Sequence, residues 1–215
     1  VISNASPVAT CAEMIDAEHQ RPEFFDQIAA HTIGPSAFTI YLGLDCPHEE
    51  LGISEPTNFI CAHTDPNRAH TEMRMLDNEP GQMLLTCYNA CDPAASPPGT
   101  TQIALVDLKY GEPWLSIPPH LYREYKYRYA EKMLAAVERL LPGFRSHIEE
   151  AEAATPLTHM RYLNTPAGSI YGFDQFIRDS RLFGQMESGV PGLYFAGAWA
   201  AGGGFQPTLM SGAST

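Results

Sequence analysis

Basic residues are scarce in this chain. Its 215 residues include 13 lysines and arginines against 25 aspartates and glutamates, which gives a formal net charge of −12 at pH 7. Binding to the phosphates of nucleic acids needs a cationic face, so we expect no nucleic-acid partner. Charged residues make up 18% and apolar residues 44% of the chain, a composition typical of folded globular proteins and not of disordered ones.

Long apolar runs are also missing. No run reaches the roughly 18 residues that a membrane-spanning helix needs. The longest, residues 189–201, is interrupted by Pro191 and several glycines. No charged-then-apolar secretion signal is present at the beginning of the sequence. We therefore expect a cytoplasmic protein, for which peripheral contact with a membrane stays open.

The five cysteines are an odd number without regular spacing, which argues against a disulfide framework and suits a reducing compartment. Cys61 and Cys87 fall in apolar stretches, where cysteine is usually a small buried side chain. We therefore predict no metal site. A metal-dependent hydrolase is kept as an alternative, although its ligands would match no standard zinc spacing: Cys61, His63, His70, Cys87 and Cys91.

Several catalytic signatures are absent as well. The sequence contains no G-x-S-x-G nucleophile elbow, no H-E-x-x-H zinc helix and no G-K-[ST] phosphate loop. Histidine titrates near neutral pH, which makes His63, His70, His120 and His159 candidates for proton transfer. None of the four lies in a recognisable motif, so we leave the catalytic residues unassigned.

The pattern of apolar residues predicts an α/β protein, with a mixed or antiparallel sheet covered by helices over about residues 34–166. The turn-rich loop at 91–99 favours an antiparallel pair between the strands on either side of it. We expect strands at 36–44, 58–63, 83–88 and 102–108, and helices within 7–33, over 122–140 and continuing through 144–154.

Glycine is concentrated near the C-terminus. A turn and a short apolar strand at 191–197 precede the glycines at 202–204, and a helix is expected to begin at Gln206 and Pro207. A strand, a glycine-rich loop and a helix N-terminus together favour an anionic or electron-rich ligand group. Glycine-rich turns also serve simply to pack a strand against a helix, so both interpretations stay open.

Residues 192–197, followed by 202–204 and 211–212, resemble the C-terminal flavin motif of the phytoene desaturase family. This family includes carotenoid isomerases and retinol saturases, within the broader amine-oxidase-like flavoproteins. Residues 1–7 resemble the strand by which the family's chain leaves its FAD domain, and 38–44 resemble the opening strand of its substrate domain. The resemblance covers nearly the whole sequence.

The resemblance implies an FAD-dependent oxidoreductase that transfers hydride between flavin and an apolar substrate, such as a polyene or isoprenoid. It assigns 1–7 and 190–215 to a Rossmann-like FAD-binding domain, and 8–189 to the substrate-binding region. The family's G-x-G-x-x-G fingerprint is absent here. We therefore expect a C-terminal fragment, inactive alone, whose partner is the N-terminal FAD-binding segment of the same parent chain. The alternative from another class is a non-catalytic module that binds a hydrophobic ligand or partner through the same sheet.

The resemblance also implies which residues contact the cofactor. Amide groups near Phe205 and Gln206 would lie beside the flavin N1–C2=O edge, where the positive helix end stabilises the anion formed on reduction. Many relatives carry an acidic residue where this chain has Ala198 and Trp199, which removes one contact to the cofactor's sugar or phosphate. Trp199 is then a contact to cofactor or substrate, or an ordinary core residue. The implied cofactor-binding residues are Gly197, Ala198, Gly203, Gly204, Phe205, Gln206 and Pro207.

Overall fold

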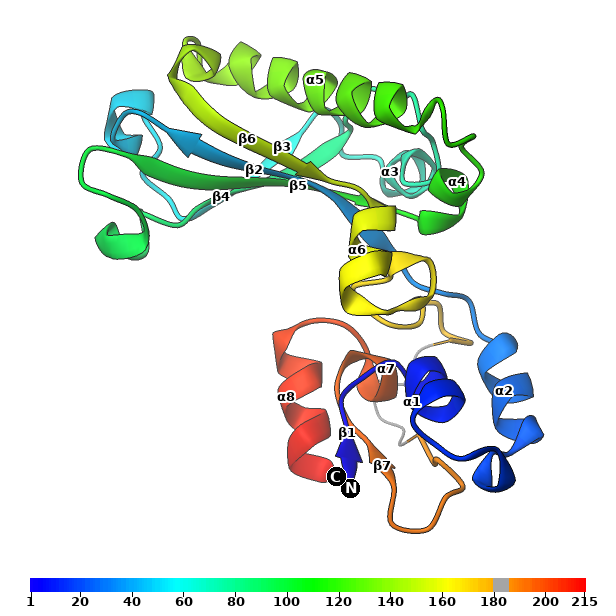
Figure 1. Ribbon diagram of the computed structural model, residues 1–215. Helices are drawn as coiled ribbons and strands as arrows, with labels where there is room; N and C mark the ends of the chain where they lie inside the picture. Colours follow the sequence, from blue (N-terminus) through cyan, green and yellow to red (C-terminus); the bar gives the residue numbers. More distant parts are fainter. Residues whose placement is uncertain (180–185) are drawn as a thin grey trace. The chain divides into compact units, whose positions relative to one another are not determined.

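The structure is a computed structural model that describes residues 1–179 and 186–215. It divides into two compact units (Figure 1). The sheet unit is Ala37–Thr155, and the terminal unit combines Val1–Ser36 with Pro156–Thr215. Residues 180–185, which belong to the predicted substrate-binding region, lie outside the described residues. No helix in the described part of the chain is long and apolar enough to cross a membrane.

The sheet unit is built on five strands in the order β3-β4-β5-β2-β6. The pairs β3–β4, β4–β5 and β2–β6 are antiparallel, which agrees with the predicted mixed or antiparallel sheet. The four strands expected from the sequence are found within two residues of their predicted ends. The strands are β2 (Ser36–Leu44), β3 (Thr57–Cys61), β4 (Gln82–Cys87), β5 (Thr101–Lys109) and β6 (Ile148–Ala154).

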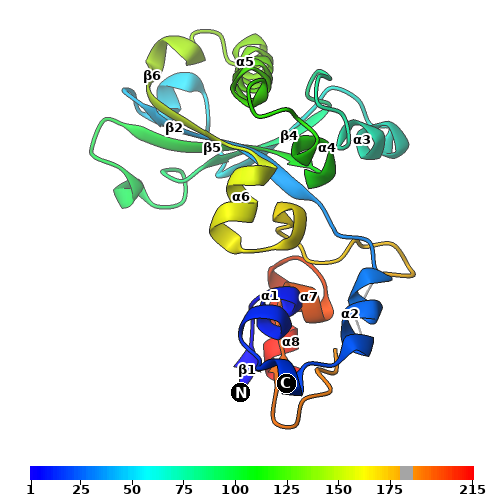
Figure 2. The ribbon, with the colours of Figure 1, turned by 45° about the vertical axis from the view of Figure 1, so that its right-hand side comes forward.

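Helices cover one face of this sheet, as both ribbon views show (Figures 1 and 2). Phe38 of β2 packs against Trp114 and Tyr129, with ring centroids 5.5 and 5.1 Å apart. All three side chains are almost completely buried because the apolar stripe of the long helix faces the sheet. The elements of this layer and its connections are α3 (Pro66–Glu72), α4 (Gly111–Leu115), α5 (Tyr122–Leu140), η2 (His48–Leu51), η3 (Pro93–Ala95) and η4 (Phe144–His147).

The opposite face of the sheet carries no α-helix from within residues 37–155, all of which the structure describes (Figure 1). Phe59, Leu84 and Val106 are paired in register across β3, β4 and β5 on this face. The Phe59 side chain is 79% exposed. Tyr41 of β2 lies on the same face because it alternates with the buried Phe38. We call this surface the open face.

The prediction that residues 144–154 are helical is wrong. They form the short η4 and the edge strand β6, whose residues pair with β2 from Thr39↔Ala154 to Leu44↔Ile148. The glutamates of β6 are exposed at the sheet edge, so backbone pairing with β2 outweighs the helix propensity of Glu and Ala. A second difference is α3, a helix that is not among those expected from the sequence.

The terminal unit brings the two ends of the chain together. The parallel strands β1 (Ile2–Ser3) and β7 (Tyr194–Phe195) pair with the register Ile2↔Tyr194. Their core includes Phe24 stacked on Phe195, with ring centroids 5.7 Å apart. The helices of this unit are α1 (Pro7–Glu13), η1 (Ala17–His19), α2 (Pro22–Ala29), α6 (Pro156–Leu163), η5 (Pro166–Gly168), α7 (Ala198–Ala201) and α8 (Phe205–Ser214).

The boundary between the two units differs from the predicted domain boundary. Residues 8–36 and 156–179 pack with the chain ends in the terminal unit, although the resemblance placed them in the substrate-binding region. The structure describes the packing alone, so the assignment of either unit to cofactor or substrate stays a prediction.

Candidate functional site

A cleft of about 590 Å³ opens in the terminal unit. Three separate segments line it: residues at 4–6, residues between 163 and 171, and residues between 198 and 209. The third segment is the glycine-rich region on which the flavin hypothesis rests. The cleft therefore includes the end of the glycine-rich loop and the helix start that the sequence indicated as a ligand site, whereas the strand β7 does not line it.

The structure gives different reasons for the presence of glycine at the three predicted cofactor-binding positions. A Cβ atom on Gly197 would lie 1.8 Å from Asn4 Oδ1, and one on Gly203 would lie 2.4 Å from the Tyr171 ring. Packing within the chain therefore requires both of these glycines. Gly204 lines the cleft, and its φ of 106° is a conformation that glycine alone adopts readily. Gly204 is the glycine whose backbone can face a ligand.

The N-terminus of α8 lies at this cleft. Gly204 precedes the helix and has no side chain with which to cap it. The first N–H groups of an α-helix have no partner within the helix, and they form its positive end. Phe205 and Gln206 supply such groups, whereas Pro207 has none. The helix start can therefore accept an anionic or carbonyl-bearing ligand group.

Two hydroxyl groups at the cleft lack partners. Ser6 and Thr165 both line it, and their hydroxyl oxygens are buried without a hydrogen bond to any described residue. Ser6 is 3% exposed and directly precedes α1, yet its side chain does not cap that helix. A buried hydroxyl without a partner costs about 1–3 kcal/mol, so a ligand that paired with these groups would gain that energy.

The seven predicted cofactor-binding residues lie in one continuous loop-and-helix segment, but they do not all face the cleft. Trp199, beside them, packs edge-on against Phe173 at 5.0 Å and also lines the cleft. It is therefore a core residue with one side toward the cleft. Ala198, Gly204 and Phe205 line the cleft, and Gly197, Gly203, Gln206 and Pro207 flank it. Contact between these seven residues and a cofactor stays a prediction.

None of the four candidate histidines is among the residues that line the cleft. In the sheet unit, His63 Nε2 lies 2.9 Å from Glu72 Oε2, and His120 is exposed on the surface. His159 of α6 has a buried Nε2 without a partner among the described residues, and burial lowers the pKa of its imidazole. The structure therefore gives none of them a role in proton transfer at the cleft.

The ligands of the metal-dependent hydrolase alternative are not brought together. Cys87 is buried as expected, whereas Cys61 is exposed, because it ends the outer strand β3. Within residues 1–179 and 186–215, the one group of at least three metal-ligating side chains is Asp45, Cys46 and His147, which shares no member with the five residues of that alternative.

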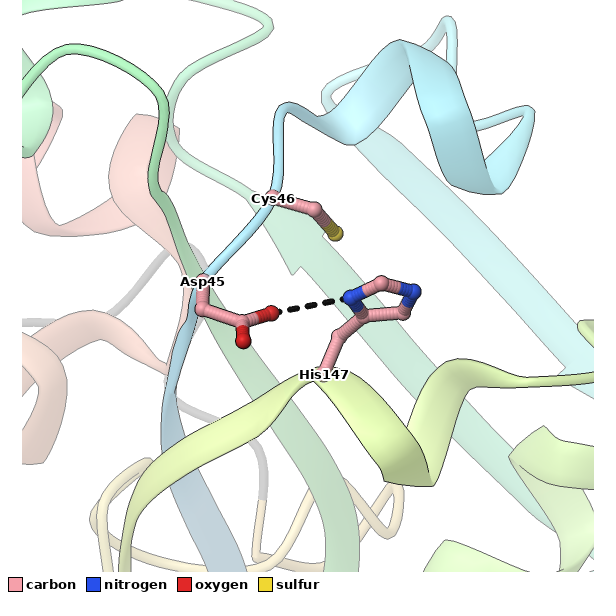
Figure 3. A group of neighbouring side chains, drawn as sticks. All are labelled: Asp45, Cys46 and His147. Carbon is pink, nitrogen blue, oxygen red and sulfur yellow. Dashed lines mark hydrogen bonds and ion pairs between the residues drawn. The ribbon is translucent and has the colours of Figure 1, made fainter.

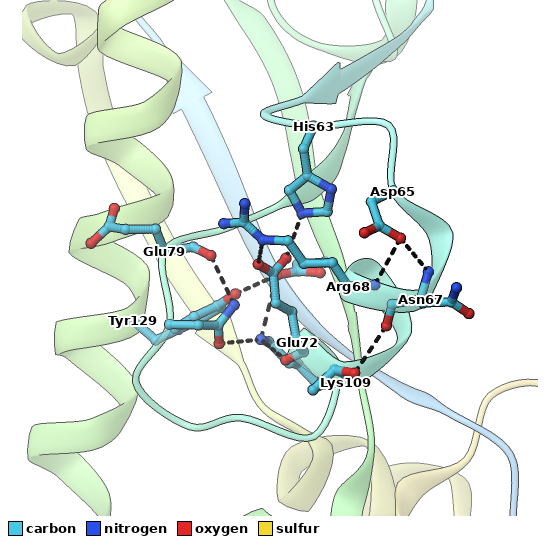
Figure 4. Close-up of polar contacts among 11 residues, drawn as sticks. His63, Asp65, Asn67, Arg68, Glu72, Glu79, Lys109 and Tyr129 are labelled. Carbon is cyan, nitrogen blue, oxygen red and sulfur yellow. Dashed lines mark hydrogen bonds and ion pairs between the residues drawn. The ribbon is translucent and has the colours of Figure 1, made fainter.

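A buried polar network occupies the helix-covered face of the sheet unit (Figure 4). The Lys109 ammonium donates to the Glu72 carbonyl at 3.0 Å and to Asn78 Oδ1 at 2.9 Å, and lies 3.7 Å from Asp107 Oδ2. The Tyr129 hydroxyl donates to the same carboxylate. Burial raises the pKa of Asp107 and lowers that of Lys109, and their mutual attraction offsets part of each shift. The Met75 carbonyl at 3.3 Å is a further acceptor, so all three donors of the ammonium are engaged within the fold.

The fold is that of an oxidoreductase of known structure. An oxidoreductase from Methanosarcina mazei matches with a TM-score of 0.55 and 16% sequence identity, covering 100% of this chain and 41% of its own. This confirms the predicted fold class.

Among curated proteins, the chain has homologues that are enzymes of carotenoid and retinoid chemistry. The all-trans-retinol 13,14-reductase of Danio rerio is 26% identical over 192 residues, which cover 82% of this chain and 32% of that protein. The chloroplastic prolycopene isomerase of Arabidopsis thaliana is 25% identical over 192 residues, covering 89% of this chain and 29% of its own length. The predicted resemblance to carotenoid isomerases and retinol saturases is therefore confirmed. The chain spans about a third of the length of these relatives, and no protein-family profile matches it.

Proposed function

We propose that this chain is the C-terminal part of an FAD-dependent oxidoreductase that transfers hydride between flavin and an apolar polyene or isoprenoid substrate. The homologues support this proposal, since their names specify retinol and prolycopene as the molecules they act on. An N-terminal segment of the same parent protein would hold the ADP half of FAD. We expect a cytoplasmic protein. Because a substrate of this kind partitions into bilayers, we also expect the protein to contact a membrane peripherally.

The cleft at the start of α8 is the observation that carries the proposal. The residues present fit a flavin, because the amides of Phe205 and Gln206 suit its carbonyl edge and the hydroxyls of Ser6 and Thr165 are buried without partners. FAD supplies the hydride acceptor or donor when it is bound. The positive end of α8 would favour negative charge at the adjacent ligand atoms.

The open face of the sheet unit is proposed to contact the substrate. Phe59, Leu84 and Val106 form an apolar row across three strands, and Tyr41 extends it on β2. Glu150 and Glu152 lie on the same face at the edge strand, since they pair with Gly43 and Tyr41. An apolar surface with a charged border would shield a polyene from water on one side.

The proposal is tested by a substitution that separates binding from stability. We expect Ser6→Ala, in the protein expressed from its complete reading frame, to weaken FAD binding about five- to tenfold, the loss of one hydrogen bond. The same change removes a buried hydroxyl without a partner, so the free energy of unfolding of the flavin-free protein should rise by up to about 1 kcal/mol. Isothermal titration with FAD and urea unfolding measure the two effects.

Ser36→Ala is the matched control. The Ser36 hydroxyl is also buried without a partner, but it does not line the cleft. It should affect stability in the same direction and leave FAD binding unchanged. If Ser6→Ala binds FAD as tightly as the unsubstituted protein, the cleft is not the flavin site.

The open face also favours a second candidate, a module that binds a hydrophobic ligand without catalysis. Phe59 is 79% exposed, so Phe59→Ser should leave stability almost unchanged while weakening retinoid or carotenoid binding. Ligand binding through the open face in a folded protein that takes up no FAD would favour this module over the oxidoreductase.

A further inference from the structure

Three side chains of metal-ligating types meet at one end of the sheet unit (Figure 3). Asp45, Cys46 and His147 each offer a ligand atom, and the three atoms lie within 4.8 Å of one another. We propose that these residues form a site for a divalent cation of the zinc class.

The backbone fixes the positions of the three ligands. Asp45 and Cys46 directly follow β2, and His147 directly precedes β6, the strand with which β2 pairs. The Asp45 N–H donates to the His147 carbonyl at 3.0 Å. The Cys46 carbonyl accepts a hydrogen bond from Thr101 Oγ1 at 2.7 Å. The ligands therefore sit on ordered backbone at the end of a sheet, which lowers the entropy cost of binding an ion.

The geometry suits a small cation. His147 Nδ1 donates to Asp45 Oδ1 at 2.8 Å, so a metal would take the place of the proton between them (Figure 3). Ligand atoms of tetrahedral zinc lie roughly 3.3–3.8 Å apart, which requires movements of about 1 Å or less here. The side chains of Asp45 and His147 are 58% and 36% exposed, which leaves the ion access to water as a fourth ligand.

The donor set determines the kind of cation. One thiol sulfur, one imidazole nitrogen and one carboxylate oxygen suit zinc and its neighbours, whereas magnesium and calcium prefer oxygen alone. Asp45 and Glu50 place negative charge beside the Cys46 thiol, and negative charge attracts a cation.

Cobalt(II) is the probe, because its bond to a thiolate gives a charge-transfer absorption that other ligands do not. We expect the reduced, chelator-treated 215-residue chain to bind one Co²⁺ with this absorption. Zn²⁺ should displace the cobalt, and a large excess of Mg²⁺ should not. Absence of the absorption in folded protein would overturn the proposal.

Variants assign the ligands. Cys46→Ser should abolish the absorption, and His147→Gln should lower Co²⁺ affinity by at least about tenfold. Since Cys46 is buried, circular dichroism must show that its variant is folded. If Cys46→Ser does not fold, the His147→Gln variant tests the site, because the His147 side chain is partly exposed and its replacement should not prevent folding. The exposed Cys91 provides the control, Cys91→Ser, which should leave the titration unchanged. Full binding by folded His147→Gln, or loss of the absorption in Cys91→Ser, would contradict the assignment.

Discussion

At the scale of single residues, the sheet unit buries a charged side chain, Lys109, within its core. Lys109 is 1% exposed, and its partners come from Glu72, Met75 and Asn78, more than thirty residues away along the chain. Alternation along β5 places Asp107 and Lys109 on the same face as Ile103 and Leu105. It does not reveal which distant groups would compensate their charges, so the network could not be predicted from the sequence.

We expect Lys109→Met to destabilise the protein by about 3 kcal/mol at neutral pH, because it leaves Asp107 buried without its cation. Burial already raises the pKa of Asp107, and removal of Lys109 raises it further. When a carboxyl has a higher pKa in the folded than in the unfolded state, the free energy of unfolding of the protein falls as the pH rises. The destabilisation should therefore be smaller at about pH 5 than at pH 7, measured by urea unfolding.

Lys126→Met is the control for this prediction. Lys126 pairs with Glu152, whose side chain is 77% exposed, so its loss should cost no more than about 1 kcal/mol. Equal effects of the two substitutions would show that the Lys109 network is not a buried charge cluster.

At the scale of elements, local patterns predicted most of the structure correctly. The strand at 36–44 and the helix at 122–140 have the predicted bounds, because their apolar periodicity matches the face that they bury. β6 was not predictable in this way, since Glu and Ala favour a helix and only β2 supplies the pairing partner. α3 had a usable signal, because Asp65 and Pro66 are a typical N-cap and first helical residue.

The N-cap of α3 gives a prediction at this scale. Asp65 accepts hydrogen bonds from the N–H groups of Asn67 and Arg68 at 2.9 and 3.3 Å. Asp65→Ala should lower the free energy of unfolding by about 1 kcal/mol, while Asp65→Asn, which keeps the cap, should change it little. Denaturant unfolding of both variants measures this difference. Equal stabilities would mean that the cap contributes nothing.

At the scale of the whole molecule, the chain consists of one continuous and one discontinuous unit. The sequence predicted a sheet region at about 34–166, and the continuous unit is Ala37–Thr155. The segments that join the chain ends in the other unit could not be assigned from local pattern, because short apolar stretches such as those around Phe24 and Phe173 do not specify their partner. The glycine-rich segment that lines the cleft stands out in the sequence, and its contact with a cofactor stays a prediction. The presence of Ser6 and Thr165 in the same cleft could not be predicted, since both lie far from this segment along the chain.

We expect residues 37–155 to fold alone. Thr39 of β2 pairs with Ala154 of β6, so the ends of this segment lie side by side, and its core includes the buried Trp114. Urea unfolding followed by circular dichroism should show one cooperative transition, which Trp114→Ala shifts to lower urea by removing about 3–5 kcal/mol. A gradual, non-cooperative change in the unsubstituted segment would show that the sheet unit needs the rest of the chain.

The most direct test of the flavin proposal is the cofactor content of the protein purified from its complete reading frame. Visible absorption and release of the cofactor by denaturation give the amount of FAD per chain. We expect one FAD per chain. In the absence of air, an apolar polyene should oxidise the reduced flavin, or the reduced product of the polyene should reduce the oxidised flavin. A folded protein that carries no flavin and takes up none when FAD is added would contradict the assignment of this chain to a flavin-dependent oxidoreductase.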